Sequence, residues 1–82
     1  MEDPVELLKE LIRIETTNPP GAEAALLDCL ERKLANAQLP FARQETAPGR
    51  GNLISRLKAD GEITLPPLVL LSHTDVVAAD PS

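Results

Sequence analysis

The most informative stretch of the sequence reads Leu68-Val69-Leu70-Leu71-Ser72-His73-Thr74-Asp75-Val76-Val77. Its first four residues are aliphatic and do not alternate with polar ones, which is typical of a strand buried on both faces of a sheet. Such a strand is normally central, with neighbours on both edges and helices above and below. The stretch therefore predicts an α/β fold with a buried strand at residues 68–71.

A histidine follows this run directly, and an aspartate stands two residues further on. In open α/β sheets, ligands bind just beyond the carboxyl ends of the strands. An imidazole there is rigidly aimed and partly desolvated, which suits a metal ligand, and Asp75 points to the same side of an extended chain. His73 is therefore a candidate metal ligand, and Asp75 a candidate acceptor for its second N–H. The alternative is a surface-loop histidine beside an aspartate that caps the next turn.

Outward from this stretch, the first half of the chain has helical patterns. Asp3 and Pro4 precede apolar residues at helical spacing, which predicts a helix over residues 4–14. A second helical pattern covers residues 22–37. Residues 16–21 lie between them and contain two prolines, so they cannot be helical.

The middle of the chain has strand and turn patterns. Residues 41–46 are a weak strand candidate, residues 48–51 a turn, and residues 52–58 a better strand. Gly49-Arg50-Gly51 is only a weak phosphate-loop candidate, because no helix opens after it. Asn18-Pro19-Pro20-Gly21 is either a rigid connection between the helices or the border of a substrate pocket.

Charge and composition exclude several classes of partner. Eight basic and 13 acidic residues give a formal net charge of −5 and a sequence pI near 4.7. Nucleic-acid binders and polybasic membrane anchors need the opposite sign, so we expect neither nucleic acid nor a membrane as partner. No basic segment followed by an apolar stretch opens the chain, and its apolar runs are too short to span a bilayer. These features predict a cytoplasmic protein.

Cysteine and histidine each occur once, as Cys29 and His73. A single cysteine excludes an internal disulfide and a multi-cysteine zinc module. Cys29 lies on an apolar helix face, which favours a small core residue. Because a tight zinc site takes three or four Cys, His or carboxylate ligands, any metal site here would lack most of its ligands.

Three segments together resemble one family. They are residues 7–21, 48–57 and 70–77. In this order they resemble the start of the co-catalytic zinc hydrolases, which include aminoacylases, glutamate carboxypeptidase, acetylornithine deacetylase and succinyl-diaminopimelate desuccinylase. The resemblance spans nearly all of the chain. It departs from the family pattern at Ser72, where glycine is common, and at Ala78, where proline is common.

The resemblance implies a fold and a chemistry. It places the chain in an α/β/α catalytic domain that opens with two helices and two or three strands of a mixed sheet. It implies that His73 is the first zinc ligand and Asp75 the catalytic-site aspartate that supports it. The family binds two zinc ions, with other divalent metals as alternatives, and a metal-activated water attacks an amide bond in a peptide or N-acyl amino acid.

The resemblance also implies that residues 1–82 are an N-terminal fragment. In the family, the remaining ligands, the catalytic glutamate and a smaller domain often used for dimerisation all lie downstream. We therefore expect a fragment of a metallopeptidase or deacylase that is inactive and poorly stable on its own. The full-length enzyme is a candidate homodimer. Asp80-Pro81 still resembles the family's continuation. The alternative is a non-catalytic interaction protein whose unfinished sheet edge pairs with another chain.

Overall fold

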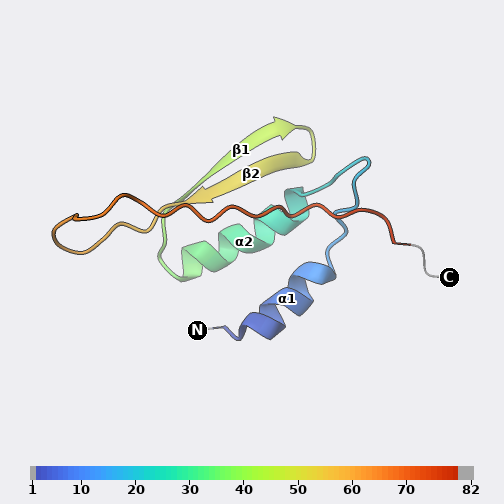
Figure 1. Cartoon of the computed structure of the whole chain (residues 1–82). Coiled ribbons are helices and arrows are strands. Elements are labelled where there is room, and N and C mark those ends of the chain that lie inside the picture. The colour runs from blue at the N-terminus through green and yellow to red at the C-terminus, as the bar shows by residue number, and fades with distance from the viewer. Residues whose placement is uncertain (1, 80–82) are drawn as a thin grey trace.

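The computed structural model describes residues 2–79 of the 82-residue chain. Its elements are, in order, α1 (Pro4–Ile12), α2 (Ala24–Asn36), β1 (Phe41–Ala47) and β2 (Arg50–Ser55). The two strands form an antiparallel hairpin, so the fold is a small α/β arrangement of two helices followed by a hairpin (Figure 1). The resemblance at Asp80-Pro81 lies outside the described residues.

Helix α1 begins as its sequence predicts but buries no side chain. The Asp3 carboxylate accepts a hydrogen bond from the backbone N–H of Val5 at 2.9 Å, and Pro4 occupies the first turn, where no donor is needed. None of the residues of α1 is buried. Polar contacts join it to α2 instead, since Lys33 Nζ lies 2.9 Å from a carboxylate oxygen of Glu10. Helix α1 is therefore a weakly held element.

The core lies between α2 and the hairpin. The buried apolar residues are Leu26, Leu27 and Cys29, all on α2. A β-carbon at Gly51 would stand 3.4 Å from Leu27 Cδ1 and 2.5 Å from the carbonyl oxygen of Gln44. Glycine is therefore required here mainly by the close approach of the Gln44 carbonyl in the neighbouring strand, while Leu27 of α2 packs against the same position. Among residues 2–79, no helix is both long and apolar enough to cross a membrane.

The structure confirms one of the two expected strands and places the other earlier in the chain. The strand expected at 41–46 is confirmed as β1, whereas the strand expected at 52–58 lies earlier in the chain. Strand β2 begins at Arg50 because the ladder continues up to the tight turn. It ends at Ser55, whose partner Phe41 is the first residue of β1. Beyond Ser55, β1 offers no further partner.

The prediction of a buried strand at residues 68–71 is wrong for this structure. These residues form no strand, and Leu71 is 95% exposed. A strand buried on both faces needs neighbours on both edges, and within residues 2–79 the only sheet is the hairpin. Figure 1 shows the segment instead as an extended trace that returns from a long loop beyond the hairpin.

The extended segment is fixed to the first loop near its far end. Thr17 and Val76 form an isolated parallel bridge. The backbone N–H of Asn18 donates to the Val76 carbonyl at 2.7 Å, and the N–H of Val76 donates to the carbonyl of Thr16 at 3.2 Å. Thr16 is buried, with 3% of its surface exposed. This bridge brings residues 73–77 beside the loop that joins the two helices.

Candidate functional site

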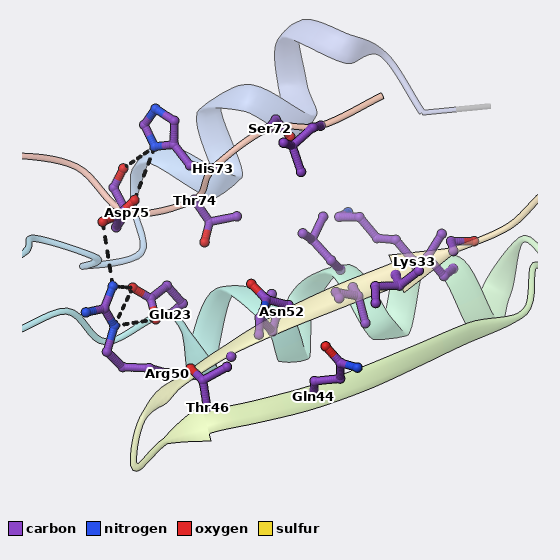
Figure 2. A pocket seen from close by; sticks show the side chains of 18 of the residues that line it. Glu23, Lys33, Gln44, Thr46, Arg50, Asn52, Ser72, His73, Thr74 and Asp75 are labelled. Carbon is purple, nitrogen blue, oxygen red and sulfur yellow. Dashed lines mark hydrogen bonds and ion pairs between the residues drawn. The ribbon is translucent and has the colours of Figure 1, made fainter. Parts of the chain in front are cut away.

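The structure brings His73 and Asp75 together. Nδ1 of the imidazole lies 2.8 Å from the backbone carbonyl oxygen of Asp75 and 3.2 Å from its carboxylate oxygen Oδ1 (Figure 2). Both oxygens are acceptors, so Nδ1 carries the proton and donates. The Nε2 lone pair of His73 is then left available to a ligand. This is the tautomer that a metal-binding imidazole adopts when its other nitrogen donates to a carboxylate.

The expectation that His73 is partly desolvated is wrong for this structure. Its side chain is 83% exposed. Desolvation was expected because the preceding run was predicted to be a central strand, and that run has no sheet neighbours among the described residues. Figure 2 shows the His73 ring and the Thr74 side chain leaving the extended segment on opposite sides. The imidazole is therefore oriented by its hydrogen bonds and not by surrounding protein.

Asp75 is held more firmly than His73. Its side chain is 29% exposed, and its Oδ2 accepts a hydrogen bond from the Asn18 side-chain amide at 3.0 Å. This hydrogen bond, with smaller contributions that include the nearby His73, holds the pKa of Asp75 below its usual value. The carboxylate also lies 3.7 Å from Arg50 Nη2. Asp75 is therefore an ionised acceptor with contacts on three sides.

An ion pair between Glu23 and Arg50 supports this group. Arg50 Nε donates to both carboxylate oxygens of Glu23 at 3.1 Å, and Nη2 donates to Oε1 at 2.9 Å. The Glu23 side chain is only 5% exposed. Its hydrogen bonds from Arg50 lower the pKa of Glu23, and the same contacts raise the pKa of Arg50. Figure 2 shows the polar series that runs from Glu23 through Arg50 and Asp75 to His73.

Two hollows border the His73–Asp75 pair. A groove of about 860 Å³ lies between residues 71–75 and the surfaces of α2 and the hairpin. It is lined by apolar side chains of α2 and β2 and by polar ones that include Gln44 and Asn52. A smaller recess of about 370 Å³ is lined by Asn18, Val76 and Val77 as well as the pair itself. The pair therefore has open space on two sides.

The donors present fit part of a metal site. An imidazole with a bare Nε2 and an ordered carboxylate are both suitable chemistry for zinc. Within residues 2–79, however, no group of three or more His, Cys, Asp or Glu side chains is placed to hold a metal ion. The arrangement offers one oriented ligand and its supporting carboxylate.

The supporting residues had only partial signals in the sequence. Asn18 lies in the loop for which a pocket border was one of two interpretations, and it lines the smaller recess. Arg50 lies in the segment considered as a phosphate loop, but it donates to Glu23 instead. Glu23 and Arg50 are 27 positions apart in sequence, so no local pattern predicts their pairing.

No known family model and no solved structure matches the chain.

Proposed function

We propose that this chain is the N-terminal part of the catalytic domain of a zinc-dependent amide hydrolase. Its substrates would be peptides or N-acyl amino acids, as the resemblance of residues 7–21, 48–57 and 70–77 implies. The observation that carries the proposal is the hydrogen bond from His73 Nδ1 to Asp75, which leaves Nε2 free to bind a metal. In this proposal the α/β/α domain includes further strands beyond the described hairpin.

Each residue has a defined role in this proposal. His73 binds the metal through Nε2, and Asp75 fixes the ring and raises its basicity as a ligand. Asn18 and Arg50 hold the Asp75 carboxylate in place. Bound zinc supplies a water of lowered pKa and polarises the amide carbonyl. The general base and the other ligands come from residues beyond those described, so the 82-residue chain alone is proposed to be inactive.

A non-catalytic interaction protein is the second candidate. The observation that favours it is the exposed apolar run at residues 68–71, together with the unpaired edge of β2 within residues 2–79. Exposed edges and apolar runs pair readily with other chains. Zinc binding distinguishes the hydrolase from the interaction protein, because an interaction protein does not need the Nε2 lone pair of His73.

The first experiment is to read the gene beyond the codon for Ser82. If the frame continues and supplies acidic ligands and a second histidine, the longer protein is expressed. There, His73→Ala should abolish amide hydrolysis and reduce bound zinc, and Asp75→Asn should lower activity or zinc affinity by about 10- to 100-fold. Asp60→Ala, an exposed acidic residue outside the site, is the matched control. Full activity in His73→Ala would contradict the proposal.

A further inference from the structure

The Asp75 carboxylate is tied to the rest of the molecule through few contacts. The extended segment that carries it forms no strand, and its backbone ties to the first loop are those of the Val76 bridge. Two side chains reach the carboxylate from outside this segment, namely Asn18 and Arg50. Asn18 belongs to the loop, whereas Arg50 is the first residue of β2. Arg50 is therefore the contact that joins Asp75 to the packed unit of α2 and the hairpin.

Arg50 has little freedom to leave this position. Three hydrogen bonds connect its Nε and Nη2 to Glu23, whose carboxylate is nearly buried. A buried carboxylate without a partner is costly, so Glu23 retains the guanidinium. A β-carbon at Gly21 would stand 2.7 Å from Arg50 Cζ, so the guanidinium also lies close to the backbone at Gly21. The hydrogen bonds to Glu23 and this close approach limit the positions that the guanidinium can take.

We infer that Arg50, anchored by Glu23, is a positioning residue that favours the Nδ1–H tautomer of His73 by holding the Asp75 carboxylate, which is one of the two acceptors of the Nδ1 proton. The biological role of this positioning rests on the proposed function, because the Nδ1–H tautomer is the one that leaves Nε2 free to bind a metal. Without Arg50, the carboxylate keeps only the Asn18 hydrogen bond from outside the segment and turns more freely. His73 then keeps the Asp75 backbone carbonyl at 2.8 Å as an acceptor for its Nδ1 proton but loses the fixed carboxylate oxygen at 3.2 Å, so the Nε2–H tautomer is populated more.

The test reads the tautomer of His73 in the metal-free 82-residue chain. His73 is the only histidine, so its imidazole signals need no assignment. The chain is labelled with ¹⁵N-histidine and measured at about pH 8.5, above the ordinary histidine pKa of about 6.5. In the wild type we expect the Nδ1–H form to predominate. In Arg50→Gln we expect the ratio of Nδ1–H to Nε2–H to fall about fivefold or more, as the loss of one ordinary hydrogen bond would produce.

Arg43 provides a matched control. It also joins the hairpin to α2, because Nη1 pairs with Asp28 and lies 3.5 Å from Glu31, but none of its hydrogen bonds or ion pairs involves Asp75. Arg43→Gln should leave the tautomer ratio unchanged. An unchanged ratio in Arg50→Gln would overturn the inference. An equal fall in both variants would overturn it as well, since general loosening would then be the cause.

A second pair of variants covers the case in which Arg50→Gln loses its helical circular dichroism. Arg50→Lys keeps the charge but not the fork that spans Glu23 and Asp75, so we expect an intermediate tautomer ratio. Arg43→Lys should match the wild type, and equal ratios in the two lysine variants would overturn the inference. Because no metal is used, these outcomes are independent of the proposed function. A longer protein that never binds zinc would contradict only that proposal.

Discussion

Gly21 and Arg50 are in such close contact that a side chain at residue 21 would require the guanidinium of Arg50 to shift. A β-carbon there would lie 2.7 Å from both Cζ and Nε of the guanidinium. Gly21 also has a φ of +81°, a conformation that residues with a side chain rarely adopt. The glycine that ends the proline-containing loop is thus fixed by two separate demands, one from its own backbone and one from Arg50.

A comparison of Gly21→Ala with Gly49→Ala distinguishes the effect of the positive φ from the effect of the contact with Arg50. Gly49 has a similar φ of +75°, but a β-carbon there meets nothing within 4 Å. Gly49→Ala should therefore cost only the conformational term, about 1–2 kcal/mol. Gly21→Ala should cost more and should also displace Arg50, which lowers the Nδ1–H share of His73. Chemical denaturation and the ¹⁵N-histidine spectrum measure the two effects. Equal behaviour of both variants would contradict the close contact.

Leu27 is expected to determine whether α2 packs on the hairpin at all. It is 2% exposed and lies against Gly51, whereas Leu57 is 82% exposed. Leu27→Ala should cost about 2–4 kcal/mol, which is comparable to the whole stability of so small a core. Leu57→Ala should stay within about 0.5 kcal/mol of the wild type. Circular dichroism during urea unfolding tests both. A stable Leu27→Ala variant would show that the core lies elsewhere.

The apolar run at residues 68–71 is expected to make the isolated chain self-associate. Leu68 and Leu70 are 84% and 88% exposed, and continuous exposed aliphatic segments pair between chains. Replacing both with glutamate should reduce association without loss of helix content, and sedimentation velocity measures it. The same change at Ile63 and Leu65, also exposed but followed by two prolines, should have a smaller effect. A monomeric wild type with a cooperative thermal transition would contradict this prediction.

Cys29 is expected to report on the contact between α1 and α2. The residue is 3% exposed, its thiol donates to a Glu10 oxygen at 3.4 Å, and burial raises the pKa of the thiol. Both effects should slow its reaction with a disulfide reagent by about tenfold or more relative to unfolded chain. Glu10→Gln should accelerate labelling, because α1 loses its charged contact with Lys33. Glu6→Gln removes only a contact within α1 and is the control.

Acidic pH should disrupt the contacts of Asp75 and Glu23, whereas pH changes near neutrality should leave these contacts intact. The pKa values of Asp75 and Glu23 are lowered in the folded chain, so their contribution to stability is complete above their unfolded values near 4. It is lost as the pH falls through the lowered values. The backbone amide signal of Asn18, which donates to Val76, should stay constant from about pH 7 to 5 and change below about 4. A change that is already complete at about pH 5 would contradict this prediction.

Local features of the fold could be predicted from the sequence because their causes are local. The cap at Asp3, the first strand and the proximity of His73 to Asp75 each depend on residues a few positions apart. Helix ends differed by only one or two residues from the expected bounds, as is usual for frayed termini. Burial at residues 68–71 could not be predicted in the same way, because it depends on neighbouring strands that the described chain does not supply.

No local sequence pattern predicted the residues that hold the Asp75 carboxylate. Asn18 and Asp75 are 57 positions apart, and Glu23 and Arg50 are 27 apart. Each of these polar residues also fits a solvated loop or helix end, and only the three-dimensional path of the chain brings them together. The sequence pattern therefore indicated the ligand candidate and its supporting aspartate, whereas the residues that hold this aspartate emerged from the structure.

The bridge between Thr17 and Val76 has a kinetic consequence. The entropy cost of closing a loop rises with its length, so we expect this contact to form after α2 and the hairpin, whose partners are nearer in sequence. We therefore expect the His73 site to assemble late in folding and to open more readily than α2 when the chain fluctuates. Amide hydrogen exchange should accordingly be faster at Asn18 and Val76 than in α2, and the site can be lost while the core is still intact.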